Sequence, residues 1–189
     1  MRELVKVGYT LMLVAFIGLI NSSCGHRNTH PKQTAALDSI AVVLHQTDSA
    51  LAKVDTVHIK KCVDHIFLTL EDVAQFYKDT VSRGASDILR SFNAVRYELQ
   101  IFMGKQGVLR KEIIKSVAQV GSLSHDIKIN RIPSDSVMMY YGFEMKKASE
   151  LIETAHHGMN SLKTQLPMYD IILPQADSLI SRVKKHQSI

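Results

Sequence analysis

Three side chains that can ligate a transition metal, His58, Cys62 and His65, follow one another at intervals of four and three residues. On a helix these intervals place all three side chains on one face. Imidazole nitrogen and thiolate sulfur bind zinc and copper, so this face would present three donors to a metal ion. A structural zinc site uses four ligands, and no second cysteine or paired histidine motif supplies the fourth nearby. Metal or ligand binding at this face is therefore an alternative function, and we predict no resident metal or cofactor.

Other patterns that would indicate catalysis are incomplete. Glu153 and His156 form one Glu-x-x-His pair, whereas a carboxylate-bridged di-iron site uses two such pairs and two further glutamates. The chain contains no G-x-S-x-G elbow and no glycine-rich phosphate loop. We therefore predict that the protein is not an enzyme.

The composition of the 189 residues indicates a helical protein, since tryptophan is absent, aromatic residues make up 6% and helix formers are abundant. Lys and Arg number 23 against 18 Asp and Glu, which gives a formal net charge of +5. The basic residues are scattered and form no long block. Scattered charges are typical of solvated helix faces, so we predict no nucleic-acid partner.

Apolar residues recur at alternating intervals of three and four, which predicts amphipathic helices. The stripes of the first two helices are offset by one residue, so we expect a bend near Asp55 and Thr56, with Thr56 as the cap of a new helix. Residues 82–86 predict a turn into a third helix. Gly104 and Gly107 predict the end of that helix.

The second half of the chain predicts a fourth helix that ends at Asn130 and a long fifth helix capped by Ser134 or Ser136. Pro167 is expected to end the fifth helix, and Pro174 to open a last short one. Short turns and narrow apolar seams predict an all-α, up-and-down bundle of about five to six helices with coiled-coil-like seams. The seam of the fifth helix consists of Met138, Tyr141, Met145, Ala148, Ile152, Ala155, Met159, Leu162 and Leu166.

The N-terminus predicts an export signal. Arg2 and Lys6 precede residues 7–20, which carry no charge and are dominated by Leu, Val, Ile, Phe and Met. This pattern is a positive n-region followed by an apolar h-region, and the run is shorter than the about 20 residues that span a bilayer. We therefore predict that residues 1–23 are a cleaved signal peptide.

The residues Ser22, Ser23, Cys24 and Gly25 resemble the lipobox of bacterial lipoproteins, although Asn21 stands where that family generally has Leu. The resemblance implies that Cys24 is acylated and becomes the new N-terminus. A glycine in place of aspartate after the cysteine implies the outer membrane, with the protein facing the periplasm. A secreted or periplasmic soluble protein cut near Ser23 is the alternative.

The chain is thus expected to have three segments. Residues 1–23 form the signal peptide, residues 24–33 a lipidated tether, and residues 34–189 a single helical bundle domain. With Cys24 acylated, Cys62 has no cysteine left as a disulfide partner.

These features predict a lipid-anchored envelope protein whose non-catalytic bundle serves protein–protein interaction or scaffolding. Its contact surface is expected at Met139, Tyr140 and Phe143, which lie off the seam of the fifth helix. The expected partners are the membrane, through the lipid anchor, and an unidentified envelope protein. A homo-oligomer formed with a second copy of the chain is a further expectation.

Overall fold

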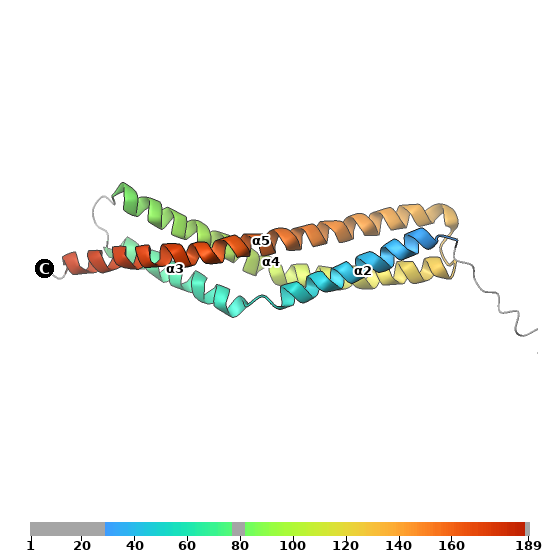
Figure 1. The fold of residues 1–189 in the computed structure, drawn as a ribbon, viewed down its shortest axis with the longest axis horizontal. Helices are drawn as coiled ribbons and strands as arrows, with labels where there is room; N and C mark the ends of the chain where they lie inside the picture. Colours follow the sequence, from blue (N-terminus) through green and yellow to red (C-terminus); the bar gives the residue numbers. More distant parts are fainter. Residues whose placement is uncertain (1–28, 77–81, 188–189) are drawn as a thin grey trace, which may run out of the picture.

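The computed structural model describes residues 29–76 and 82–187, which form four α-helices and no strand (Figure 1). With the labels of Figure 1, these helices are α2 (Pro31–Ala52), α3 (Thr56–Phe76), α4 (Arg83–Lys128) and α5 (Ser134–Gln187). The predicted all-α class is confirmed. The predicted number of five to six helices is wrong for the described residues, because two expected helix breaks do not occur.

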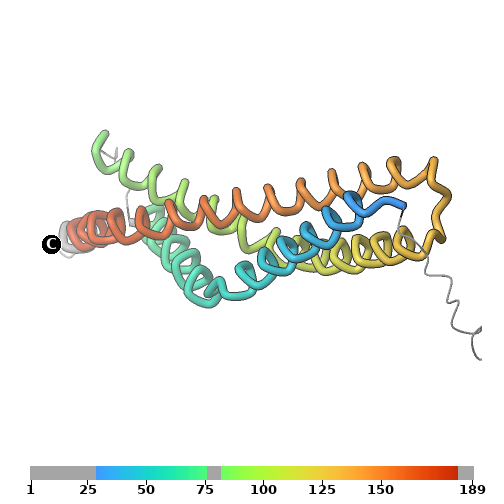
Figure 2. The backbone as a smooth tube through the Cα atoms, turned by 45° about the vertical axis from the view of Figure 1, so that its right-hand side comes forward, coloured from blue at the N-terminus to red at the C-terminus, as the bar shows by residue number. Residues whose placement is uncertain are grey.

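Two long helices, α4 and α5, run antiparallel along an elongated rod (Figures 1 and 2). The shorter helices α2 and α3 follow each other along this pair, and each of them packs on both α4 and α5. At a rise of 1.5 Å per residue, the 54 residues of α5 extend for about 80 Å. The molecule is therefore a three-helix rod in which the first helix is broken into two segments.

An apolar core runs along the rod because every helix buries one face. In α2 the buried stripe is Leu37, Leu44 and Leu51, all with no exposed surface and spaced by seven residues. Burying such a side chain stabilises the fold by about 1.5–3 kcal/mol. The seven-residue spacing keeps the stripe turned toward α4 and α5. Large buried side chains of the other helices include Ile59, Ile66, Phe92, Leu99, Ile113, Val120, Ile127 and Val137.

The expected bend separates α2 from α3 between residues 52 and 56. The backbone N–H of His58 donates to Oδ1 of Asp55 at 2.9 Å, so Asp55 caps α3. The prediction that Thr56 is the cap is therefore wrong. Asp55 lies three residues before the N–H that it satisfies, which is the usual spacing of an N-cap side chain and its partner.

The helix α4 passes through Gly104 and Gly107 without the predicted break. A glycine inside a helix costs about 1 kcal/mol relative to alanine. Phe102 and Ile113 are nevertheless buried on either side of the glycines, so the core stripe is continuous. Between them, Gln106 contacts the end of α2. Packing along the rod therefore outweighs the local preference of the two glycines.

The helix α5 passes through Pro167 and Pro174, so the predicted end and restart of the helix are also wrong. A proline in a helix interior removes one hydrogen bond and costs about 3 kcal/mol. The core stripe continues beyond Pro167 through Tyr169, Ile172 and Ala176, which are all buried. The packing of this extension on α3 and α4 keeps the segment helical.

Two helix starts differ from the expected positions. Pro31 begins α2 inside the segment expected to be tether, because the fixed φ angle of proline suits a first helical turn. In α5 the buried stripe begins at Val137, which has no exposed surface, and the expected core residue Met138 is 55% exposed. The start of α5 is therefore rotated by one position, about 100°, relative to the prediction.

Candidate functional site

One seam between α4 and α5 is covered by neither α2 nor α3. Two hollows open along it, lined only by residues of α4, α5 and the turn between them. Tyr140 and Glu144 line the first hollow, and Thr154 and Gly158, each fourteen residues later, line the second. Residues fourteen positions apart, which is two heptads, lie on the same side of a packed helix, so the two hollows share one strip of α5. We call this strip the outer seam, and its two openings the end hollow (at residues 140 and 144) and the mid hollow (at residues 154 and 158).

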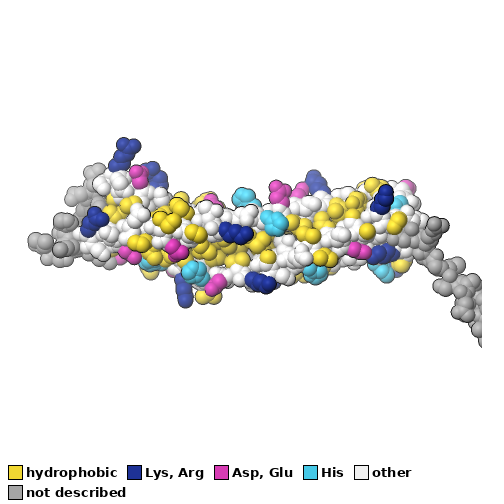
Figure 3. All heavy atoms as spheres, in the orientation of Figure 1, with side chains coloured by type: hydrophobic (Ala, Val, Ile, Leu, Met, Phe, Trp, Pro, Cys, Tyr) yellow, Lys and Arg dark blue, Asp and Glu magenta, His cyan; other side chains and the backbone are white. Residues whose placement is uncertain are grey.

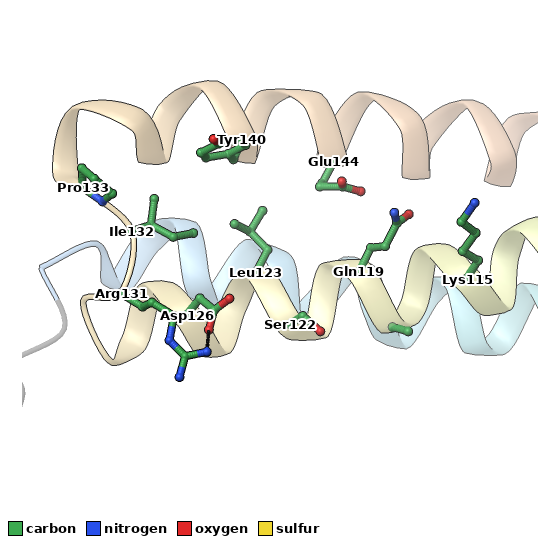
Figure 4. A pocket seen from close by; sticks show the side chains of 11 residues that line it. Lys115, Gln119, Ser122, Leu123, Asp126, Arg131, Ile132, Pro133, Tyr140 and Glu144 are labelled. Atoms are coloured by element: carbon green, nitrogen blue, oxygen red, sulfur yellow. Dashed lines mark hydrogen bonds and ion pairs between the residues drawn. The ribbon is translucent and has the colours of Figure 1, made fainter.

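The end hollow has a volume of about 580 Å³ and lies beside the turn that joins α4 to α5 (Figure 4). The apolar side chains of Leu123 and Ile132 point into the space between the two helices (Figure 4). Ala118 and Ser122 also line it, and their small side chains leave room along α4. The end hollow therefore combines an apolar base with an open side.

Local hydrogen bonds fix the turn that closes this end. Asn130 has a φ of 52°, a left-handed conformation that asparagine adopts more readily than most residues. The backbone N–H of Arg131 donates to the carbonyl oxygen of Asp126 at 2.8 Å. The guanidinium Nη1 of Arg131 also lies 3.0 Å from Oδ1 of Asp126 (Figure 4). These contacts fix the turn that brings Ile132 and Pro133 into the lining of the end hollow.

A buried acceptor lies on the α5 side of the end hollow. Oε2 of Glu144 is buried and has no hydrogen-bond partner within the described ranges. The side chains of Gln119 and Lys115 rise from α4 toward it (Figure 4). Oε1 of Gln119 accepts a hydrogen bond from Nζ of Lys147 at 2.9 Å. An unsatisfied buried acceptor costs about 1–3 kcal/mol. The end hollow therefore offers an acceptor to a donor group from outside.

The mid hollow is smaller, with a volume of about 280 Å³. Phe102 forms part of its base, packed against Gly158, where a Cβ atom would lie only 3.2 Å from Cδ2 of the ring. At its rim, Oγ of Ser161 donates to Oε2 of Glu98 at 3.3 Å. The polar side chains at this rim are thus partly engaged with each other, and the mid hollow offers less free chemistry than the end hollow.

The three residues predicted to form a contact surface lie at the end of the rod that carries the end hollow. Tyr140 lines the end hollow and is 46% exposed. Met139 and Phe143 are not part of the lining and are 63% and 66% exposed. The structure therefore divides the predicted set into one residue of the outer seam and two on an adjacent surface.

The predicted metal-binding face has separate contacts for its members. Nε2 of His58 lies 3.7 Å from Sγ of Cys62. His65 is directed elsewhere, because its Nδ1 lies 2.8 Å from the hydroxyl of Tyr169 on α5 and its Nε2 lies 4.0 Å from Oδ1 of Asp177. Among the described residues, no group of three or more His, Cys, Asp and Glu side chains is arranged to hold a metal ion.

Burial controls the acid–base chemistry of this face. The pKa of the Cys62 thiol is raised, mainly by burial and then by the charge of Asp170. The pKa of Tyr169 is raised to about 12, first by burial and then by the nearby Cys62, Asp170 and Asp177. The phenol ring also stacks on Phe92 of α4, at 5.9 Å between ring centres. At neutral pH the thiol is therefore protonated, whereas a metal ligand or nucleophile needs the thiolate.

The predicted lipidation site Cys24 and the predicted signal peptide lie outside the described residues. Glu153 and His156 are both exposed on α5. Within the described ranges, no helix is long and apolar enough to cross a membrane. No protein-family model, curated protein or solved structure matches the chain. The chemistry of the site therefore rests on the geometry of this molecule alone.

The outer seam was not predicted from the sequence, although a signal for it exists. Four polar residues of α4 are separated by multiples of seven residues, and each of them lines a hollow. Glu98 and Lys105 line the mid hollow, and Gln119 and Asp126 line the end hollow. Polar residues in heptad register beside an apolar stripe mark the flank of a helix–helix seam. The sequence alone does not show that this flank is left uncovered, because that depends on where α2 and α3 pack.

Proposed function

We propose that the protein is a lipid-anchored, non-catalytic adaptor of the bacterial cell envelope that binds a helical segment of another envelope protein in the end hollow. The observation that carries the proposal is the buried, unpartnered Oε2 of Glu144 beside the apolar base of this hollow. Native proteins satisfy nearly all buried acceptors, so this oxygen favours a donor supplied by a partner.

A helix is the occupant that fits the shape of the site. The groove between two antiparallel helices accepts a further helix through apolar side chains at three- and four-residue spacing. In the end hollow these side chains would contact Leu123 and Ile132, and a Lys, Arg, Asn or Gln of the partner would donate to Glu144. The exposed ring of Tyr140 would cover one side of the bound helix.

The proposed anchor places this site near the membrane. Acylation of Cys24 with several chains would give lasting attachment, whereas one chain gives only marginal binding. One residue of the expected tether contacts the start of α5, since Nε2 of His30 lies 2.8 Å from Oγ of Ser134. The end hollow is therefore at the anchored end of the rod, and the partner would be an outer-membrane or periplasmic protein that reaches this end.

The binding proposal is tested by photocrosslinking in whole cells that express the full chain. A photoreactive phenylalanine derivative replaces Tyr140 on α5, and the control replaces the exposed Tyr97 on α4. We expect a protein crosslinked at residue 140 and absent at residue 97, with the crosslink mapping to a helical segment that contains a donor side chain.

A space-filling variant makes this test specific for the hollow. Ser122→Leu fills the end hollow, whereas Gly121→Ala adds a methyl group with no atom within 4 Å. The crosslink should disappear with Ser122→Leu and persist with Gly121→Ala. Equal crosslinking in both variants, or a crosslink to a non-helical segment, would overturn the proposal.

The anchor is tested separately by incorporation of labelled palmitate into the full chain and into Cys24→Ser. Label in the unmodified chain and none in the variant would support acylation of Cys24. Equal labelling of the two, or no label in either, would leave the adaptor without its proposed anchor.

A further inference from the structure

An apolar surface lies next to the end hollow and is not used by it. Of the fourteen exposed large apolar side chains in the described residues, four fall within six positions at the start of α5. Tyr140 belongs to the end hollow, and the other three, Met138, Met139 and Phe143, form what we call the α5 patch. Apolar side chains gather over the first part of α5 on the face seen in Figure 3.

The α5 patch is at the end of the rod where the chain leaves the proposed tether. Oγ1 of Thr29 donates to Oδ1 of Asn130 in the α4–α5 turn at 3.2 Å. The side-chain amide of Gln33 in α2 donates to Sδ of Met138 at 3.4 Å. The first described residues of the chain are therefore in direct contact with the turn and with the α5 patch.

Chain length limits how far this end can be from an acyl anchor. Cys24 precedes Thr29 by five residues, which span at most about 18 Å when fully extended. Phe143 is nine residues into α5, about 14 Å along a rod of about 80 Å. An anchor on Cys24 therefore keeps the whole α5 patch close to the bilayer, whatever the path of the tether.

We propose that the α5 patch lies on the bilayer surface, as a second membrane contact beside the lipid on Cys24; this inference rests on the proposed anchor. Flexible thioether side chains and a phenyl ring suit the boundary between headgroups and acyl chains. The lipid on Cys24 and the α5 patch together would fix the inclination of the rod to the bilayer, because the α5 patch is on the lateral surface of the rod. The orientation of the outer seam toward a partner would be fixed with it.

The charges around the α5 patch indicate which lipids are needed. Lys128 is paired with Asp38 at 2.8 Å, and Arg131 with Asp126 at 3.0 Å. These two basic groups are thus neutralised by neighbouring carboxylates. The α5 patch itself consists of apolar side chains, so its contact is not expected to depend on anionic lipid, and a neutral phosphatidylcholine vesicle is the appropriate probe.

The test uses the acylated full chain, reconstituted in phosphatidylcholine vesicles that contain a headgroup-linked spin label as a quencher. A fluorophore is attached to Gly142→Cys, next to Phe143, or to the control Gly84→Cys near the far end of α4; both glycines are exposed and have no atom near an added Cβ. Both carry Cys62→Ala so that the label has one target. We expect quenching at residue 142 and none at residue 84.

Two comparisons separate the membrane contact from the anchor. With Met139→Ser and Phe143→Ser together, quenching at residue 142 should fall to the level of residue 84 while the protein still floats with the vesicles. Flotation without quenching at residue 142 overturns the membrane contact and leaves the anchor standing. Aqueous iodide, a quencher that acts from the water phase, gives the second comparison. If residue 142 is shielded from iodide but is not quenched by the lipid label, the α5 patch is covered by a second protein, and the proposed membrane contact is overturned. Absence of flotation shows that the proposed anchor has failed.

Discussion

The side-chain amide of Gln106 in the middle of α4 donates a 2.7 Å hydrogen bond to the carbonyl oxygen of Leu51 at the end of α2. The last carbonyl groups of a helix lack partners within it, and this contact supplies one from another helix. It lies where the first helix of the rod is broken. The break is therefore held in place by a specific contact with α4.

Replacing Gln106 with alanine is expected to lower the free energy of unfolding. The carbonyl oxygen of Leu51 would lose its side-chain donor while keeping the 3.3 Å hydrogen bond from the backbone N–H of Val54, at a cost of about 1 kcal/mol. Gln100→Ala, at an exposed position of the same helix, should change stability by no more than about 0.5 kcal/mol. Urea denaturation of the two variants checks this difference, and equal stabilities would mean that the contact contributes nothing.

The continuity of α4 through its glycines leads to a second prediction. Gly104→Ala and Gly107→Ala should each stabilise the protein, by up to about 1 kcal/mol, because both positions are helical and an added Cβ has no atom within 4 Å. Gly158→Ala should gain less, since its Cβ would lie 3.2 Å from the ring of Phe102. Thermal or urea unfolding provides the comparison. Destabilisation by either of the first two variants would show that α4 is interrupted there.

The sequence predicted the helices and their buried faces well wherever a three-four stripe is regular, as in the leucines of α2. It failed at the glycines of α4 and the prolines of α5, because local preferences of about 1–3 kcal/mol were overcome by packing between helices that the sequence does not show. The outer seam could not be predicted for the same reason, since it is also formed by packing between helices. Whether Oε2 of Glu144 is buried depends on the approach of α4 to α5, while the sequence around this residue resembles that of any exposed helical glutamate.

A pH dependence follows from the burial of Tyr169. Its pKa in the folded protein is raised to about 12, above the ordinary value of 10.0 in the unfolded chain. The folded state therefore holds this proton more tightly, so stability is unaffected below pH 10 and falls as the pH rises from about 10 to 12, by up to about 3 kcal/mol. The fall should be visible in urea denaturation midpoints measured across this range.

Matched variants isolate the contribution of this tyrosine from that of the lysines, which titrate in the same range. Tyr169→Phe should lose its part of the alkaline decline, and it should also be less stable at neutral pH because the contact with His65 is removed. Tyr97→Phe, at a position 59% exposed, should decline like the unmodified chain. Identical pH profiles for all three proteins would contradict the assignment.

The thiol of Cys62 is expected to be unreactive in the folded protein. It is 2% exposed and its pKa is raised by burial, so both access and thiolate formation are limited. Reaction with an aromatic disulfide reagent should be slow in buffer and fast in denaturant. Gly84→Cys in a Cys62→Ala background provides an exposed thiol that should react rapidly in both conditions.

The same cysteine allows the metal-binding alternative to be measured. Zinc and copper are quantified in the purified full chain, in Cys62→Ala and in His65→Ala. Since His65 contacts Tyr169 rather than Cys62, we expect the metal content to be the same in all three and well below one ion per chain. Stoichiometric metal that is lost in both variants would support metal binding at this face.

The last prediction concerns Glu144, whose buried Oε2 is unsatisfied. Glu144→Met keeps the helix propensity and volume of the side chain but removes the unsatisfied acceptor, so it should stabilise the free protein by about 1 kcal/mol. Glu153→Met, at an exposed position of the same helix, should change stability by less than about 0.5 kcal/mol. The photocrosslink from residue 140 should nevertheless weaken in Glu144→Met, because the partner's donor loses its acceptor. These two results together would show that Glu144 lowers the stability of the free protein and contributes to binding of the partner. Destabilisation by Glu144→Met, with the crosslink unchanged, would instead make this carboxylate a structural group.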